Sequence, residues 1–249
     1  MDELDFHRAL FRPGTLIDAG AHDGGLTLPF AAQPGAQVIA FEPLPQAFGR
    51  LQNLVLVQYG GSVPSHISLQ QTALGDQAGE IVLEVPVVGG VMQEQWASVA
   101  KDYEGLRAAD PRIDTIHRVT VAIQPLDALA LTDVTGIKID VEGAEAEVLR
   151  GARKTLLRCQ PVLSVEIEER HRPGNLRRVP YFLSELGYQG FYEYLGKWRK
   201  IEQFDASAMQ RASPSPADFK VSDPYIFCFY FVPRDRVGEL AQLARLPTT

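Results

Sequence analysis

The sequence predicts an α/β fold, Rossmann-like, with a mostly parallel sheet and helices on both faces. Short apolar, β-prone runs alternate with helical patterns through most of the 249 residues, and glycine or proline ends several of the runs. Such alternation is typical of parallel strands joined by crossover helices. No internal repeat or linker divides the chain, so we expect a single domain spanning residues 1–249.

The first part of the chain is expected to supply three strands and a helix. Residues 15–20 (TLIDAG) form a short apolar run ended by glycine, and residues 36–42 (AQVIAFE) form a second run that prolines stop. A helix is expected next, because apolar side chains recur at helical spacing. These side chains are Phe48, Leu51, Leu54 and Val55. Residues 66–74 (HISLQQTAL) are predicted to form the third strand.

The pattern then changes in a way that indicates an insertion. Residues 80–87 and 117–123 each alternate between apolar and polar side chains, which predicts two strands of a hairpin-like insert. Residues 89–116 show no clear period, and long structureless loops are uncommon in compact domains. We therefore expect an inserted lid or substrate loop around residues 79–123.

Strand–helix alternation resumes in the second half and brings the expected number of strands to seven. Further strands are predicted at 136–142, 161–167, 192–201 (a strand or a hairpin) and 225–232, with helices at 144–157 and 181–186. Residues 202–222 are polar, contain Ser213-Pro-Ser-Pro216, and are expected to form a flexible loop. No crossover helix is recognisable between the last two strands, which favours an antiparallel last strand.

The composition limits the kinds of partner that this protein is expected to bind. The net charge of −7 and the pI of about 5.3 disfavour broad nucleic-acid binding, which needs a basic face. The first residues, MDELDFHRAL, lack the features of a signal peptide, and the longest apolar run, 225–232, is too short to span a bilayer. Cys159 and Cys228 have no spacing that suggests a disulfide or metal site. We expect a cytoplasmic protein with no membrane or nucleic-acid partner.

A glycine-rich motif follows the first strand, where open α/β sheets bind nucleoside cofactors. The motif is Asp18-Ala-Gly20-Ala-His22-Asp23-Gly24-Gly25. Gly20 lets the backbone approach a ligand, and Asp18 could organise the turn or hold water near the cofactor. His22 replaces a glycine that a dinucleotide needs near its pyrophosphate, whereas S-adenosylmethionine has no phosphate. A plain structural turn is the alternative interpretation.

Two more acids follow the next strands. Glu42, in Phe41-Glu42-Pro43, can accept hydrogen bonds from both ribose hydroxyls, although NAD enzymes share this feature and a solvated surface glutamate is the alternative. Asp76, in Ala73-Leu74-Gly75-Asp76, lies where an acid often reaches the adenine amino group. An ordinary turn aspartate is as good an interpretation of Asp76.

Ionisable residues gather in two later strands. Lys138, Asp140 and Glu142 alternate along an otherwise apolar strand, where charges cost desolvation energy unless they pair or face a cleft. Glu166 lies near the end of the next strand with Glu168, and His171 follows it. A carboxylate or histidine here could take a proton from a substrate hydroxyl. A structural ion-pair cluster, with His171 as a bystander, is the alternative.

Taken together, these segments resemble the FkbM family of methyltransferases. The similar segments are LIDAGAHDGG (16–25), AFEPLPQAFGRL (40–51), QTALGDQAG (71–79), IKIDVEGAEAEVLRGA (137–152), PVLSVEIE (161–168) and PYIFCFYFVP (224–233). Family members often carry asparagine and an apolar residue at His22-Asp23. The resemblance implies a class I methyltransferase fold and O-methylation of a hydroxyl on a small molecule, sugar or polyketide-type product.

For such an enzyme we predict the following roles. The residues expected to hold S-adenosylmethionine are Asp18, Gly20, His22, Glu42, Asp76 and Asp140. Asp140 is also expected near the sulfonium or the nucleophile, and Glu142, Glu166 or His171 is expected to supply the base. No metal is predicted, because the sequence offers no dedicated ligand spacing. The alternative functions are an NAD(P)-dependent oxidoreductase and a non-catalytic S-adenosylmethionine-binding protein.

Overall fold

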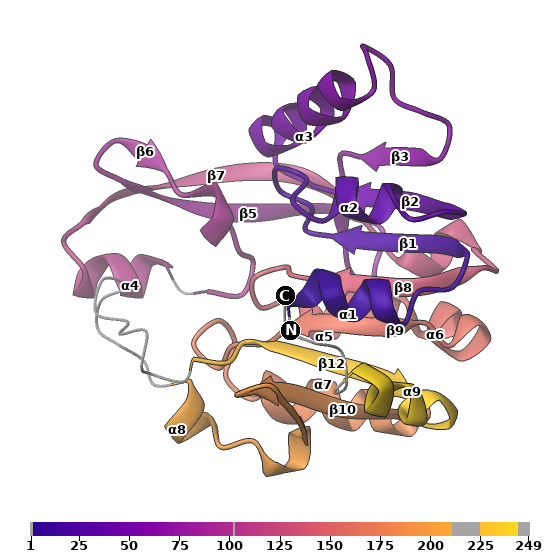
Figure 1. The fold of residues 1–249 in the computed structure, drawn as a ribbon. Helices are drawn as coiled ribbons and strands as arrows, with labels where there is room; N and C mark the ends of the chain where they lie inside the picture. Colours follow the sequence, from indigo (N-terminus) through magenta and orange to yellow (C-terminus); the bar gives the residue numbers. More distant parts are fainter. Residues whose placement is uncertain (1, 102, 211–224, 244–249) are drawn as a thin grey trace.

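The computed structural model describes residues 2–101, 103–210 and 225–243. Within these ranges the main sheet has eight strands in the order β11-β10-β12-β9-β8-β1-β2-β3 (Figure 1). The strands are β1 (Gly14–Ala19), β2 (Ala36–Phe41), β3 (Ile67–Gln70), β8 (Val134–Ile139), β9 (Val162–Glu166), β10 (Tyr188–Tyr194), β11 (Lys197–Lys200) and β12 (Cys228–Pro233).

The centre of the sheet is parallel, as predicted. Strand β1 pairs in parallel with β2 and β8, while β3 and β9 extend the parallel set on either side. Strand β12 lies antiparallel between β9 and β10, which confirms the predicted direction of the last strand. Within the described ranges the sheet has eight strands and not the seven that we predict, because β10 and β11 form a hairpin.

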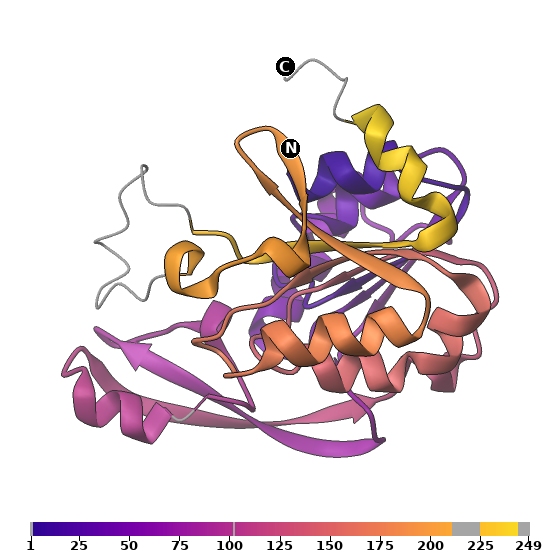
Figure 2. The same ribbon diagram turned by 90° about the horizontal axis from the view of Figure 1, so that it is seen from below.

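Helices cover both faces of this sheet (Figure 2). One face carries α1 (Glu3–Ala9), α2 (Thr27–Ala31), α3 (Pro45–Gln58) and α9 (Val237–Leu243), and the other carries α5 (Glu145–Gly151), α6 (Arg153–Cys159) and α7 (Asn175–Glu185). Pro45 begins α3, where its missing N–H costs no helical hydrogen bond. In the described ranges no helix has the length and apolar character needed to cross a membrane.

Several predicted boundaries differ from those in the structure. The helix predicted at 144–157 is two helices, α5 and α6, which meet at Ala152. Helix α7 begins at Asn175, well before the predicted start at 181. Pro180 is of a residue type that often marks a helix boundary, but here it lies inside α7, whose buried side chains have a regular spacing. The strand predicted at 136–142 ends at Ile139. The Ser213–Pro216 run lies outside the described residues.

The predicted insertion forms a second sheet that projects away from the main one (Figure 1). Its strands are β4 (Ala73–Leu74), β5 (Gly79–Val88), β6 (Val91–Met92) and β7 (Ile113–Gln124). Strands β5 and β7 pair antiparallel, as the alternation predicted. The predicted third strand divides, because residues 67–70 join the main sheet and β4 joins β7.

The segment between β5 and β7 has its own structure and is anchored to the main body. It contains β6, the short 3₁₀ helix η1 (Glu94–Trp96) and α4 (Tyr103–Ala109). Leu83, Val85 and Val121 of the hairpin pack with Leu44 and Ala47 at the start of α3. The remaining short helices are η2 (Leu126–Leu129), η3 (Ile201–Gln203), α8 (Ala206–Met209) and η5 (Arg234–Arg236).

Candidate active site

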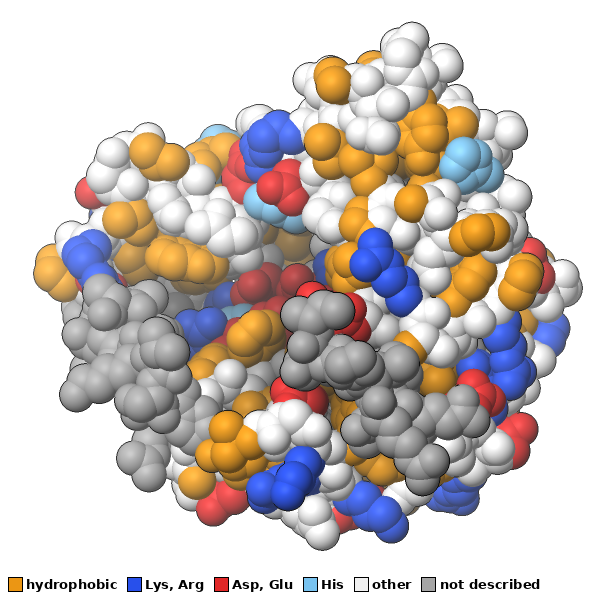
Figure 3. Space-filling model, viewed as in Figure 1, with side chains coloured by type: hydrophobic (Ala, Val, Ile, Leu, Met, Phe, Trp, Pro, Cys, Tyr) orange, Lys and Arg blue, Asp and Glu red, His pale blue; other side chains and the backbone are white. Residues whose placement is uncertain are grey.

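A cavity of about 370 Å³ opens where the central strands end, within the range of small-molecule sites. Figure 3 shows a hollow in which acidic side chains gather beside the insertion. The main body contributes Gly20, His22, Glu42, Asp140, Glu142 and Glu166 to the lining, and the insertion contributes Leu83, Glu94, Trp96, Ala97 and Val99. The cavity is therefore enclosed by both sheets.

The glycine turn after β1 is held by close backbone packing. Gly20 has a φ of +79°, and a Cβ there would lie 1.8 Å from the backbone oxygen of Asp140. Glycine is thus required by the approach of the backbone after β8. Gly20 also lines the cavity, and its approach to a cofactor stays a prediction. His22 lines the cavity with a φ of +48°, a conformation that is uncommon without glycine.

Asp18 lies beneath this turn and does not line the cavity. Its Oδ2 accepts a hydrogen bond from Thr27 Oγ1 at 2.7 Å, and its Oδ1 lies 3.5 Å from Lys138 Nζ. The Lys138 ammonium also donates to the Gly20 carbonyl at 2.5 Å and lies 3.6 Å from Asp140 Oδ2. This arrangement supports the turn-organising role for Asp18, and Lys138 joins it to the acid that faces the cavity.

Lys138 stays charged in this setting. Burial lowers the pKa of its ammonium group, but the carboxylates of Asp140 and Asp18 outweigh burial, and the net shift is upward. The Lys138 side chain is only 7% exposed, so its charge would be costly without a partner. The ion pairs with the two carboxylates compensate this cost.

Glu42 is fixed by the backbone on both oxygens. Oε2 accepts from the His22 N–H and Oε1 accepts from the Leu44 N–H, each at 2.9 Å. Burial raises the pKa of Glu42, against these two hydrogen bonds. A carboxylate has about four acceptor positions, so capacity remains toward the cavity that Glu42 lines.

Asp76 reaches the same cavity from the turn after β4. Its Oδ2 accepts from Arg150 Nε of α5 at 3.0 Å, and Arg150 also bonds Glu147 at 2.8 Å. The structure thus brings together five of the six predicted cofactor-binding residues around the cavity, and Asp18 supports them from below.

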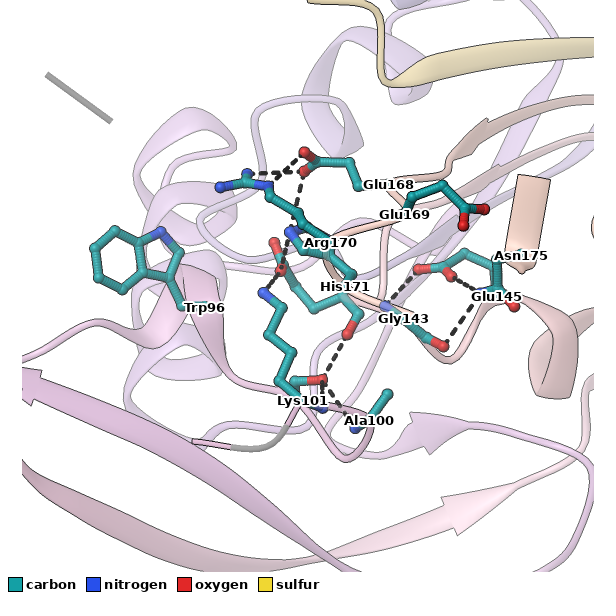
Figure 4. Close-up of polar contacts among 12 residues, drawn as sticks. Trp96, Ala100, Lys101, Gly143, Glu145, Glu168, Glu169, Arg170, His171 and Asn175 are labelled. Atoms are coloured by element: carbon teal, nitrogen blue, oxygen red, sulfur yellow. Dashed lines mark hydrogen bonds and ion pairs between the residues drawn. The ribbon is translucent and has the colours of Figure 1, made fainter. Parts of the chain in front are cut away.

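The predicted base candidates cluster at the ends of β8 and β9. Figure 4 shows Lys101 and His171 converging here, below Glu168 and Arg170. His171 Nε2 lies 3.0 Å from Glu168 Oε1 and 3.3 Å from Glu142 Oε2. Glu142 Oε2 also forms an ion pair with Lys101 Nζ. Glu142 and Glu166 line the cavity, whereas His171 lies behind them.

Proton affinities separate the members of this cluster. Burial raises the pKa of Glu142 to about 7, despite the opposing charge of Lys101. Burial, with the charges of Asp140 and Glu142, raises the pKa of Glu166 and so favours its protonated form. Burial lowers the pKa of His171 to about 3, which leaves a neutral imidazole. Glu142 is therefore the candidate that changes charge near neutrality.

Glu168 remains ionised. Burial favours its neutral form, but hydrogen bonds from Arg170 at 2.6 and 2.9 Å, together with His171 and Tyr225, shift its pKa downward overall. Arg170 itself lines the cavity, so the ion pair with Glu168 forms part of the wall.

Some site residues carried no assigned role in the sequence. Glu145 accepts from the Gly143 N–H at 2.7 Å and from Asn175 Nδ2 at 2.8 Å, which fixes the turn that carries Glu142. Lys101 and Trp96 come from the insertion, where no periodic pattern marked them. The spacing of DVEGAE could have pointed to Glu145, but nothing in 89–116 pointed to Lys101.

Three of the clustered residues have metal-binding side chains. Among the described residues, Glu142, Glu166 and His171 each place one ligand atom within 4.8 Å of the others. Carboxylate and imidazole ligands suit several divalent metals. In this arrangement, however, the Lys101 ammonium group already neutralises Glu142.

Comparison with known proteins places this site in a family. The family model described as the methyltransferase FkbM domain matches residues 18–189, which contain all of the residues assigned above. The chain belongs to the FkbM methyltransferase family. The predicted resemblance is thereby confirmed, and the fold is the Rossmann-like class I methyltransferase fold.

Two relatives share less than 30% of their aligned residues with this FkbM-family chain. It is 29% identical over 146 residues to Methyltransferase 1 of Beauveria bassiana (strain ARSEF 2860), covering 55% of this chain and 57% of that protein. It is 27% identical over 194 residues to Methyltransferase sdnD of Sordaria araneosa, covering 70% and 73%. The crystal structure of Methyltransferase FkbM from Methylobacillus flagellatus KT matches 92% of this chain and 50% of its own, with 18% identity and a TM-score of 0.54.

Proposed function

We propose that this protein is an S-adenosylmethionine-dependent O-methyltransferase acting on a hydroxyl of a small molecule, sugar or polyketide-type product. One observation carries the proposal within the FkbM family. A single cavity has at one side Glu42, held by two backbone N–H groups, and at the other Glu142, whose pKa is about 7. A nucleoside-binding acid and a base thus face the same space.

The residues fit this cofactor. Glu42 has acceptor capacity for ribose hydroxyls, and Asp76 lies in the same wall for an adenine amino group. Asp140, held by Lys138, faces the cavity as a negative charge suited to a sulfonium. His22 stands where a dinucleotide pyrophosphate would need glycine, which disfavours a nicotinamide cofactor.

The bound cofactor would supply an electrophilic methyl group, whose bond to sulfur breaks with the electron pair going to sulfur. The protein's part is to align the acceptor oxygen and exclude water. An acceptor hydroxyl has a pKa far above neutrality, so a base assists the transfer. Glu142 takes the hydroxyl proton in this proposal, while the neutral His171, whose Nε2 lies 3.3 Å from Glu142 Oε2, holds the Glu142 side chain in place.

The acceptor is proposed to be a small molecule or glycan rather than nucleic acid. The net charge of −7 and the acidic lining of the cavity both oppose the approach of a phosphate backbone. The segment η1, with Trp96, forms the wall opposite the strand ends and is positioned to contact an acceptor. We also propose that residues 1–249 act as one domain, since the insertion completes the cavity.

Calorimetry tests the cofactor first. S-adenosylmethionine and S-adenosylhomocysteine should bind saturably, and NADH should not. Glu42→Gln should weaken binding, whereas Glu80→Gln, an exposed acid outside the cavity, should not. A labelled methyl donor and a panel of hydroxyl acceptors then test transfer. NADH binding alone would favour an oxidoreductase, and tight cofactor binding without transfer across the panel would favour a non-catalytic binding protein.

A further inference from the structure

The cation that pairs with Glu142 belongs to the insertion and not to the main sheet. Lys101 Nζ forms an ion pair with Glu142 Oε2, and the two side chains are only 8% and 17% exposed. Removing one partner of such a shielded pair leaves an uncompensated charge or drives protonation of the acid. The state of Glu142 therefore depends on a residue of the insertion.

The segment that carries Lys101 is docked directly on the turn that carries Glu142. Ser98 Oγ donates to the Glu142 carbonyl at 2.5 Å and accepts from the Ala100 N–H at 2.9 Å. Gly143 has a φ of +107°, and a Cβ there would lie 2.9 Å from Ala100 Cβ. Only glycine allows the two segments to approach this closely, and the approach brings Lys101 to Glu142.

The backbone of Glu142 itself is strained. Its φ is +55°, a conformation that is rare for a residue with a side chain and persists only where its surroundings enforce it. Ser98 on the Glu142 carbonyl and Glu145 on the next N–H supply that enforcement. The surroundings thus fix the backbone at Glu142, and Lys101 pairs with its side chain.

Most other groups facing Glu142 are acidic or already paired. These groups are Asp140 after β8, Glu166 and Glu168 at the end of β9, Arg170 and His171 after it, and Tyr103 of α4. The charges of Asp140 and Glu168 favour the protonated form of Glu142. Arg170 is bound by Glu168 through two hydrogen bonds, and His171 is neutral, so among the residues that the structure describes Lys101 is the cation in direct contact with Glu142.

We propose that Lys101 is a positioning residue for methyl transfer: its ammonium group holds the Glu142 carboxylate ionised and in place at the cavity. This inference rests on the proposed function. When the acceptor O–H bond breaks, its proton passes to Glu142 as the new O–CH₃ bond forms, and Lys101 keeps its own protons throughout. The base is therefore competent only while residues 98–101 of the insertion are docked.

Carbon-13 NMR of glutamate side-chain carboxyls tests this directly, with Glu142→Gln used to assign the Glu142 signal. In the wild-type protein that signal should titrate near 7, the pKa given by burial and Lys101. In Lys101→Met the midpoint should move upward by about 1–3 pH units, because an opposite charge is lost. Lys101→Arg should restore the wild-type midpoint. Arg107→Met removes an exposed cation of the same insertion and should leave it unchanged.

An unchanged Glu142 midpoint in Lys101→Met overturns the inference, and so does a Lys101→Arg variant that behaves like Lys101→Met. With an acceptor that the wild-type protein methylates, the midpoint of the rate against pH should move with the NMR midpoint, while the Kd for S-adenosylhomocysteine stays unchanged. Absence of cofactor binding to the wild-type protein overturns the proposed function and the role of Lys101 in it. Cofactor binding and transfer with an unmoved midpoint overturn the inference alone.

Discussion

Lys138 Nζ lies 3.5 Å from the Asp18 carboxylate and so ties β8 to β1 directly beneath the glycine turn. Because both side chains are nearly fully buried, Lys138→Met leaves Asp18 with an unpaired buried charge. We expect the free energy of unfolding to fall by about 3–5 kcal/mol, as for other broken buried pairs. Urea denaturation measures this, with the exposed Lys197→Met as the control. Equal stability of the two variants would contradict the role assigned to Lys138.

Glu142 should set the pH dependence of methyl transfer. Its pKa of about 7 means that the base form accumulates as the pH rises through neutrality. We expect the rate to rise with a midpoint near that value and then level off. Glu142→Gln should lower the rate by roughly 10²–10⁴-fold, the usual contribution of a base. Initial rates with a labelled methyl donor test both points, and a Glu142→Gln variant with the wild-type profile would exclude Glu142 as the base.

Glu145 should make the free energy of unfolding fall as the pH rises, whereas the rate of methyl transfer should rise. Burial raises its pKa from 4.5 to about 7, despite hydrogen bonds from Gly143 and Asn175. Since the folded state holds this proton more tightly than the unfolded state, the stabilisation is complete below about 4.5 and is lost as the pH rises toward 7. We expect the free energy of unfolding to fall over this interval.

Glu145→Gln should remove part of that fall. A glutamine oxygen can still accept from Gly143. If the Asn175 amide turns over, the glutamine amide can donate to Asn175 Oδ1, which has no hydrogen-bond partner among the described residues. The variant should therefore fold and show a smaller loss of stability between acid and neutral pH. Urea denaturation at both ends of the interval measures the difference. A loss as large as that of the wild-type protein would show that Glu145 is not responsible.

Gly20→Ala should disrupt the floor of the cavity. The new Cβ would lie 1.8 Å from the Asp140 oxygen, and the φ of +79° disfavours any side chain. We expect a loss of about 3 kcal/mol in the free energy of unfolding and much weaker S-adenosylhomocysteine binding. Gly25→Ala is the matched control, because its Cβ would meet nothing closer than 3.9 Å. Equal stability and equal S-adenosylhomocysteine binding of the two variants would mean that the ends of β1 and β8 can move apart to accommodate a side chain at residue 20.

The sequence predicted the sheet and one side of the site well, because local signals determine both. Apolar runs ended by glycine or proline located the central strands, and parallel strands bring their carboxyl ends to one edge. Glu42 and Asp140 could therefore be placed together from their positions alone. The start of α7 could not be placed, because Pro180 within it looks like a helix boundary.

The other side of the site depends on contacts between segments far apart in the sequence. Lys101 meets Glu142 only because the insertion folds back onto the turn at Gly143, and no periodic pattern in 89–116 announces this. The raised pKa of Glu166 likewise results from burial together with the charges of acids that follow β8 and β9. His171 was a reasonable base candidate by its position in the sequence, but packing places it behind the carboxylates.

The same charge balance leads to a prediction about metals. Glu142, Glu166 and His171 are close enough to share a divalent ion, yet Glu142 already pairs with Lys101, and the raised pKa of Glu166 favours its protonated form. A metal would have to displace the Lys101 ammonium group from Glu142 and a proton from Glu166 before these carboxylates could bind it. We therefore expect methyl transfer to be unchanged after exhaustive chelation, and added Mg²⁺ or Mn²⁺ not to increase it. Activity that disappears on chelation and returns with either ion would show that the metal outcompetes Lys101 for Glu142.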